Sequence, residues 1–379
     1  MIDLISGALT SMRWSRFPTL PGVLAGLAAL LIVAVTAQSR GGSQDPQPAQ
    51  STGVQNPAPE ETLQTINDDY SRQLIELDRG RVARISRLAA RQDPVAAAST
   101  YEQLFRLAIA ANLFQDAETA ANAVINSGSP SPATVGLAHL VKIVAQADRG
   151  AYEESLASLK HALTCAETGK ASAPGAVLST AELIGICDAY FQRLVHSDQV
   201  ETARKAFQLA FDHAQRPALK EFLANRLKRL ELVGKPAPGI VGKDVDGKPF
   251  SLADTRGKVV LVEFWASWCL PSGEEAEWFQ KATQTYRDRG FEIVGINLDA
   301  LQEGGLRVET VLPSIRRFLI EHNVRWPNLI SATGESDYAG SYAVTDIPAN
   351  YLIGRDGTIR QIDVVRKNLD AAISRELDR

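Results

Sequence analysis

The residue best placed for covalent chemistry is Cys269, in the segment WCLPS at 268–272. An apolar run at 259–264, interrupted only by Glu263, comes just before it and predicts a strand buried on both faces of a sheet. Helical spacing follows, with Pro271 in the first turn. At such a junction the unpaired backbone N–H groups and the positive end of the helix dipole favour a thiolate. The pattern therefore predicts a nucleophilic cysteine.

The run FWASWCLPS at 264–272 resembles the active-site segment of the thioredoxin superfamily. The chain from about Val233 is similar to the exported, membrane-tethered, AhpC/TSA-type branch of that superfamily, the TlpA/ResA type. This resemblance implies an α/β thioredoxin fold over 233–379. One departure affects the chemistry: the family motif is Trp-Cys-x-Pro-Cys, and here the second cysteine is replaced by Ser272.

A second segment supports the resemblance. Thr-Asp-Ile-Pro at 345–348 stands where the family carries a cis proline that faces the cysteine. The resemblance implies that the Ile347–Pro348 bond is cis, and that the backbone of Ile347 binds an extended segment of the substrate. An ordinary loop proline is the alternative, and the hairpin expected directly after it makes that alternative weaker.

Two acids and two tryptophans also match family positions. The resemblance implies that Glu263 is a buried acid that relays protons, and loss of hydration inside an apolar strand should raise its pKa. The alternative is a carboxylate paired with a lysine or a backbone donor. Glu275 matches an acid near the active site of the tethered branch, although a glutamate in a first helical turn also simply complements the dipole. We expect Trp265 in the core and Trp268 as a lid beside the thiol.

A single thiol restricts the possible reactions. A two-cysteine thioredoxin releases its mixed disulfide when the second thiol attacks the first sulfur, and Ser272 cannot do this. Its hydroxyl can still hydrogen-bond the thiolate of Cys269. We therefore expect thiol–disulfide exchange with protein disulfide or thiol substrates, in which an outside thiol or the substrate's own second cysteine resolves each mixed disulfide.

Three alternatives remain open. A thiol-dependent peroxidase is one, but Ala266 stands where the peroxiredoxin pattern carries threonine. The second is a non-catalytic thioredoxin fold that binds proteins. The third is a serine introduced by hand to trap complexes, which the intact targeting segment makes less attractive.

Length, charge and cysteine content limit the number of domains and the kinds of partner and cofactor that are expected. With 379 residues, two domains plus tails are expected. The formal net charge is −4 and no basic block occurs, which argues against nucleic acid as a partner. The three cysteines, Cys165, Cys187 and Cys269, do not match metal-ligand spacing, so neither a metal nor a cofactor is expected. We expect Cys165 and Cys187 to be buried small hydrophobes, with a structural disulfide as the alternative.

The N-terminal region has the features of a targeting element. Two arginines precede an uncharged run at 17–39, so residues 1–37 are predicted to be a signal peptide or a membrane anchor. The triplet at 35–37 could serve as a cleavage site, but the run is long enough to span a bilayer, and we favour an uncleaved anchor. Residues 38–60, rich in Gln, Pro, Ser and Gly, predict a disordered linker. The folded part should therefore be exported, periplasmic or otherwise extracytoplasmic, and tethered to the membrane.

The middle of the chain, 61–232, has helical periodicity throughout. Apolar spacing predicts helix pairs over 101–124, 131–163 and 183–211, the second beginning with a Ser cap and a Pro. The arrangement resembles a tetratricopeptide-like array, and 150–156 matches a piece of that repeat. Such an array would bind a protein on its concave face; a helical bundle acting as a spacer is the alternative.

The order of elements after 233 matches the resemblance. A short hairpin with an Asp-Gly turn is expected at 240–252, followed by strand, helix, strand, helix, strand, strand and helix. The strands are expected at 259–264, 291–298, 349–353 and 358–362, and the helices from 270, through 315–320, and at the C-terminal end.

Overall fold

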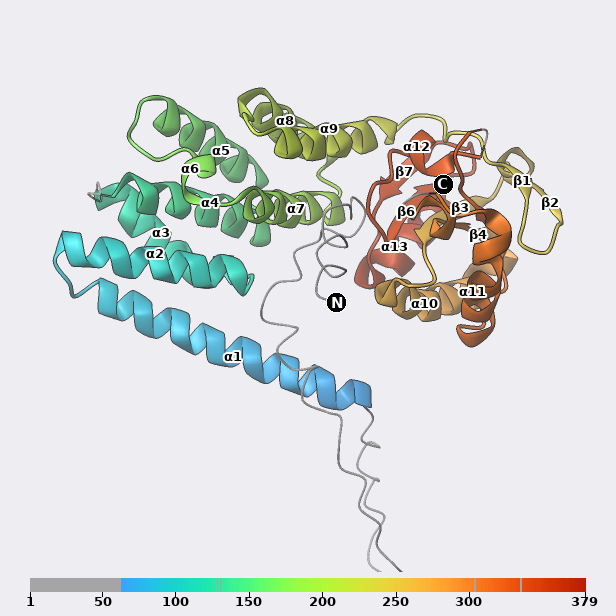
Figure 1. Ribbon diagram of the computed structural model, residues 1–379, viewed down its shortest axis with the longest axis horizontal. Coiled ribbons are helices and arrows are strands. Elements are labelled where there is room, and N and C mark those ends of the chain that lie inside the picture. The colour runs from blue at the N-terminus through green and yellow to red at the C-terminus, as the bar shows by residue number, and fades with distance from the viewer. Residues whose placement is uncertain (1–62, 128, 130, 303–304, 335) are drawn as a thin grey trace, which may run out of the picture.

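The computed structural model describes residues 63–127, 129, 131–302, 305–334 and 336–379 (Figure 1). The predicted targeting segment at 1–37 and linker at 38–60 lie outside these residues. Within the described part, no helix combines the length and the apolar character needed to cross a bilayer.

The first part of the described chain is helical, as expected (Figure 1). The predicted helix pairs form as α2–α3, α4–α5 and α7–α8, and the two helices of each pair pack against each other. Whether they form a tetratricopeptide-like repeat stays a prediction. The helices are α1 (Leu63–Ala89), α2 (Pro94–Ala110), α3 (Phe114–Ser127), α4 (Pro132–Asp148), α5 (Tyr152–Glu167), α6 (Pro174–Val177), α7 (Thr180–His196), α8 (Val200–His213) and α9 (Pro217–Leu232).

Side-chain caps fix where several of these helices begin. The Ser131 hydroxyl accepts a hydrogen bond from the Thr134 N–H at 3.2 Å, and Pro132 occupies the first helical position, as predicted. Ser179 and Glu182 form a reciprocal capping box at the start of α7.

The two cysteines of the helical part are both free. Cys165 is buried near the end of α5, and Cys187 lies within α7. Desolvation, with a smaller contribution from Asp188, raises the pKa of the Cys187 thiol to about 12. Cys187 is therefore a thiol at neutral pH and a poor nucleophile.

The second part is a five-stranded mixed sheet with helices around it, the thioredoxin fold that the resemblance implied (Figure 1). The strand order is β5-β4-β3-β6-β7; β3 lies at the centre, parallel to β4 and antiparallel to β6. Every residue of β3 is buried, as its apolar run predicts. The bounds are β1 (Val241–Lys243), β2 (Pro249–Ser251), β3 (Val259–Trp265), α10 (Leu270–Tyr286), β4 (Phe291–Asn297), α11 (Val308–Glu321), β5 (Asn328–Ile330), α12 (Tyr338–Ser341), β6 (Ala349–Ile353), β7 (Ile359–Ile362) and α13 (Arg366–Leu377).

The expected β1–β2 hairpin forms outside this sheet, with Gly247 at a φ of +81° in its turn. One strand was not expected. The edge strand β5 pairs in parallel with β4 over three residues, too few for an alternating pattern to be visible in the sequence.

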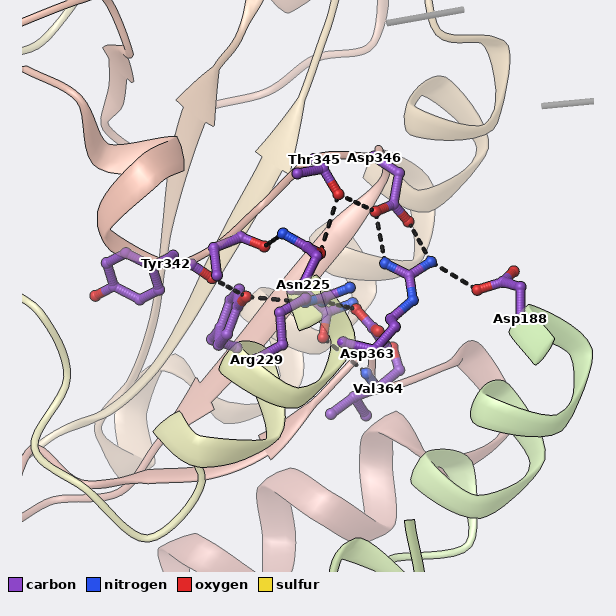
Figure 2. A network of polar contacts seen from close by, with 12 residues as sticks. Asp188, Asn225, Arg229, Tyr342, Thr345, Asp346, Asp363 and Val364 are labelled. Atoms are coloured by element: carbon purple, nitrogen blue, oxygen red, sulfur yellow. Dashed lines mark hydrogen bonds and ion pairs between the residues drawn. The ribbon is translucent and has the colours of Figure 1, made fainter. Parts of the chain in front are cut away.

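The helical part and the sheet meet across α9 (Figure 1). Two arginines of α9, Arg226 and Arg229, are each 1% exposed. Arg229 donates from Nε to the Tyr351 hydroxyl at 3.0 Å and pairs through its guanidinium with Asp363 at 2.5 Å (Figure 2). A helix that lies more than 100 residues before β6 and β7 in the chain therefore contributes buried positive charge to this side of the sheet.

Because Arg229→Met would leave the Asp363 carboxylate buried without its counter-ion, we expect it to lower the free energy of unfolding by about 3–5 kcal/mol. Denaturant unfolding of the full chain would measure this. The matched control is Arg375→Met, which breaks the half-exposed pair between Arg375 and Asp198 across the same interface and should lower it by less than about 1 kcal/mol. Equal losses in the two variants would contradict the argument.

Candidate functional site

Cys269 lies at the junction between β3 and α10, as predicted, and is the N-cap residue of α10. The loop before it is held by Asp299, whose carboxylate accepts hydrogen bonds from the Ser267 N–H at 2.9 Å and the Ser267 hydroxyl at 2.6 Å. Asp299 was not among the residues predicted from the sequence. The available signal was its position just after β4, because neighbouring parallel strands end at the same edge of the sheet.

The cis proline faces this cysteine. The Ile347–Pro348 bond is cis, which confirms the expectation, and Cys269 Sγ lies 3.9 Å from the Ile347 carbonyl oxygen. Cys269 itself is 8% exposed. The structure thus brings together the thiol and the backbone segment that the resemblance assigned to substrate binding.

Glu263 is buried at the centre of the sheet, between Gly295 of β4 and Asn350 of β6. Desolvation raises its pKa to about 8; the hydrogen bond that it accepts from the Trp326 indole N–H at 2.7 Å opposes this shift, and Glu275 adds to it. Its partner is therefore Trp326, rather than the lysine or backbone donor considered above. Sequence reasoning missed Trp326, which lies just before the unexpected strand β5.

Glu275 is partly buried on the first turns of α10. Desolvation raises its pKa to about 8, with further contributions from the negative charges of Asp363 and Glu274. Both candidate acids thus hold a proton over much of the neutral range. This favours a role for Glu275 beyond complementing the helix dipole.

The two tryptophans have different environments. Trp265 is buried, stacks on Phe318 at 4.4 Å between ring centroids, and donates its indole N–H to Asn328 at 2.9 Å. Trp268 is 48% exposed directly before Cys269. These positions fit the expected core residue and the expected lid, and the role of Trp268 stays a prediction.

Ser272 does not make the expected hydrogen bond with Cys269. Its hydroxyl is buried in the first turn of α10 and has no hydrogen-bond partner within the described part of the chain. Only the backbone connects the two residues, through the Ser272 N–H and the Cys269 carbonyl at 3.1 Å. Next to it, Gly273 leaves room for the His322 ring, because a Cβ at 273 would lie 2.6 Å from a carbon of that ring.

The other α9 arginine reaches the segment that carries the cis proline. Arg226 pairs with both carboxylate oxygens of Asp346, at 2.6 and 2.9 Å, and with Asp188 at 2.6 Å. Burial opposes ionisation of Asp346, but Arg226 outweighs it and holds the pKa of that carboxyl below its ordinary value. Asp346 directly precedes Ile347.

A second α9 residue contacts the same loop. Asn225 donates to the Ala343 carbonyl at 3.1 Å and accepts from the Thr345 hydroxyl at 3.0 Å (Figure 2). Both hydrogen bonds join positions about 120 residues apart in the chain. The spacing of residues within α9 therefore could not predict these contacts.

Comparison with known proteins agrees with this geometry. Residues 233–362 match the AhpC/TSA family. Thiol-disulfide oxidoreductase ResA from Bacillus thuringiensis subsp. konkukian is 30% identical over 129 residues, which cover 34% of this chain and 68% of that protein. The chain belongs to the AhpC/TSA family. Another relative is the thioredoxin-like protein YneN from Bacillus subtilis. It is 30% identical over 131 residues, and the match covers 35% of this chain and 71% of YneN.

Solved structures also match the AhpC/TSA domain. A putative thiol:disulfide interchange protein DsbE from Chlorobium tepidum is 26% identical, with a TM-score of 0.33, and the match covers 38% of this chain and 97% of that one.

Around Cys269 the described residues offer no group of three metal-ligating side chains; the group that does occur lies in the helical part.

The raised pKa of Glu263 predicts a pH-dependent stability. Since its folded-state pKa of about 8 exceeds the ordinary value of 4.5, its contribution is present below the ordinary value and is lost as the pH rises through 8. Glu263→Gln should therefore reduce the fall in the free energy of unfolding between pH 5 and 8 by about 1.4 kcal/mol per pH unit. Denaturant unfolding at a series of pH values would test this. Glu277→Gln, at an exposed position of α10, is the control, and an unchanged slope in Glu263→Gln would contradict the prediction.

The pairing of Asp346 with Arg226 predicts a positioning effect on the cis-proline loop. Asp346→Asn removes the charge and should slow mixed-disulfide formation at Cys269 on the order of tenfold, the equivalent of one charge-assisted hydrogen bond. Alkylation of Cys269 by iodoacetamide, which does not need the loop, should keep its rate. Asp378→Asn, which loses an exposed pair with Arg289, serves as the control. An equal slowing of both reactions in Asp346→Asn would count against a positioning role.

Proposed function

We propose that this chain is an exported thiol-disulfide oxidoreductase that acts through the single thiol of Cys269. The observation that carries the proposal is the approach of Cys269 Sγ to the Ile347 carbonyl oxygen, beside the cis proline and at the start of α10. Membership of the AhpC/TSA family and similarity to proteins named thiol-disulfide oxidoreductase ResA support it. Catalysis is assigned to Cys269, with Glu263, Glu275, Trp268 and Ser272 around it, and substrate binding to the Ile347–Pro348 segment.

The first step is attack by the Cys269 thiolate on one sulfur of a substrate disulfide. A bond forms between Sγ and that sulfur, the substrate S–S bond breaks, and the other substrate sulfur leaves as a thiolate. Cys269 is thereby oxidised to the mixed disulfide and the leaving sulfur is reduced. The leaving thiolate needs a proton, and the carboxyls of Glu263 and Glu275, with pKa values of about 8, are protonated at neutral pH.

The second step requires a thiol from elsewhere, because Ser272 stands at the position of the resolving cysteine. A thiolate of the substrate or of a small molecule attacks the substrate sulfur of the mixed disulfide, forms a new disulfide with it and releases the Cys269 thiolate. The attacking thiol is oxidised in this step. The cycle exchanges one disulfide for another, which suits isomerisation or deglutathionylation and gives no net dithiol reduction by this domain alone.

The surroundings of the thiol support a polypeptide substrate. The exposed apolar side chains Trp268 and Leu270 flank Cys269, so a polypeptide that reaches the sulfur contacts both. The backbone of Ile347 is available to an extended segment. Protein disulfides and protein thiols fit these features.

The remaining assignments concern location and domains. We propose a segment at 1–37 that targets or anchors the chain to a membrane, a linker at 38–60, a helical domain at 61–232 that binds a protein, and a thioredoxin-like domain at 233–379. Together they would hold an extracytoplasmic exchange site at the end of a tether.

A second candidate is a non-catalytic protein-binding module, favoured by the 8% exposure of Cys269. The two candidates differ in the reactivity of the thiol. Iodoacetamide alkylation of the native chain at neutral pH should be faster than that of a free cysteine if Cys269 is a nucleophile. A rate no faster than that of an ordinary thiol would favour the binding module.

Replacing the missing resolving thiol tests the proposed cycle. Incubated with oxidised glutathione, the full chain should accumulate one mixed disulfide at Cys269, visible by mass spectrometry, until a thiol is added. In Ser272→Cys the lifetime of this species should fall at least on the order of 100-fold, because resolution becomes intramolecular.

The controls separate Cys269 from the other thiols. Cys269→Ser should form no such species, and Cys187→Ser should behave as the parent chain. Absence of the mixed disulfide in the parent chain, or an unchanged lifetime in Ser272→Cys, would overturn the monothiol cycle.

A further inference from the structure

A cluster of metal-ligating side chains lies in the helical part, remote from Cys269 in sequence. His139 belongs to α4, and His161 and Cys165 lie one turn apart on α5. One donor atom from each of the three lies within 4.8 Å of the others. From these residues we propose a Zn²⁺ site that joins α4 to α5, independent of the chemistry at Cys269.

The geometry of the α5 pair is already close to that of a metal site. His161 Nε2 lies 3.4 Å from Cys165 Sγ. In tetrahedral Zn²⁺ sites, metal–nitrogen bonds of about 2.0 Å and metal–sulfur bonds of about 2.3 Å place neighbouring donor atoms about 3.3–3.6 Å apart. Two residues four apart on a helix present their side chains on one face, which is why this pair can share an ion.

His139 supplies the third donor from the facing helix. Its ring lies edge-on to that of His161, with 5.4 Å between centroids. Because the three donor atoms lie within 4.8 Å of one another, they need to approach by no more than about 1.5 Å to reach tetrahedral spacing.

A buried ring nitrogen of His139 that lacks a partner is the independent observation that points to a ligand. The residue is 3% exposed, and its Nδ1 atom has no hydrogen-bond partner among the residues that the structure describes. A buried polar atom without a partner destabilises a fold, and a bound ion or an ordered water is a common reason for one in a native protein. A metal that orients the imidazole ring would account for this histidine among apolar neighbours.

The donor set selects the kind of ion. One thiolate and two imidazoles suit Zn²⁺, whereas Mg²⁺ and Ca²⁺ prefer oxygen ligands. The thiolate also offsets the positive charge of Lys142, which acts on His139 electrostatically. His161 is exposed, so the site has an entry path, and a fourth ligand such as water can come from solvent.

Metal binding to the full chain tests the site directly. After treatment with a chelator, the chain should bind one equivalent of Zn²⁺ in competition with a chromophoric chelator. Co²⁺ in place of Zn²⁺ should give a thiolate-to-metal charge-transfer band. His161→Asn and Cys165→Ser should each weaken Zn²⁺ binding on the order of 100-fold, and Cys165→Ser should abolish the band.

Two controls keep the result interpretable. Cys187→Ser and Cys269→Ser, which change the other two thiols, should bind Zn²⁺ as the parent chain does. Without metal, substitution of the exposed His161 in His161→Asn should leave the midpoint of thermal unfolding unchanged. Added Zn²⁺ should raise the midpoint of the parent chain and of the two control variants, but not that of His161→Asn. Failure to compete with the chelator, or binding that survives both His161→Asn and Cys165→Ser, would overturn the proposal.

Discussion

The geometry of the candidate site depends on two buried guanidinium groups of α9. A buried charge is tolerated only when opposite charge and hydrogen bonds neutralise it, so Arg226 and Arg229 require carboxylates at fixed places. On the side of the sheet, those carboxylates are Asp346, directly before the cis Ile347–Pro348 bond, and Asp363, directly after β7; Asp188 of α7 also pairs with Arg226. The helical part therefore packs beside the sheet and at the same time supplies the counter-ions for the loop that faces Cys269.

The acids of the site act on one another electrostatically, and the first of them, Asp363, is paired with an arginine of α9. Asp363 pairs with Arg229, and its negative charge contributes to the raised pKa of Glu275, which in turn contributes to that of Glu263. In both glutamates the largest cause is loss of hydration. An acid that stays protonated near neutrality is suited to donate a proton to a leaving thiolate, a task that remains when no second thiol is present.

The sequence predicted those parts of the site that local pattern determines. The β3 run, the placement of Cys269 at a helix start and the cis proline were all recognisable, because each depends on a few consecutive residues. Short elements such as β5 were not, since three residues show no period.

Contacts between distant segments were also missed. Trp326, Asp299 and His322 reach the site from chain positions that carry no motif. The two α9 arginines, three positions apart on a helix, resemble an ordinary solvated face until the sheet that buries them is placed against it. The expected hydrogen bond from Ser272 to Cys269 does not form. Such a bond depends on the direction of one side-chain hydroxyl, and the spacing of residues in a sequence does not determine that direction.

Ser272 has a physical consequence beyond the absence of a second thiol. A buried hydroxyl without a partner destabilises a fold by about 1–3 kcal/mol, whereas a cysteine at the same place buries readily and forms only weak hydrogen bonds. Serine therefore contributes nothing to packing here that a cysteine would not. Its remaining effect is kinetic: it removes the intramolecular attack that would end a mixed disulfide. Under the proposed monothiol function, a site with a thiol beside a cis-proline loop held by α9, and with two protonated acids, would form mixed disulfides with partners and hold each of them until another thiol arrives.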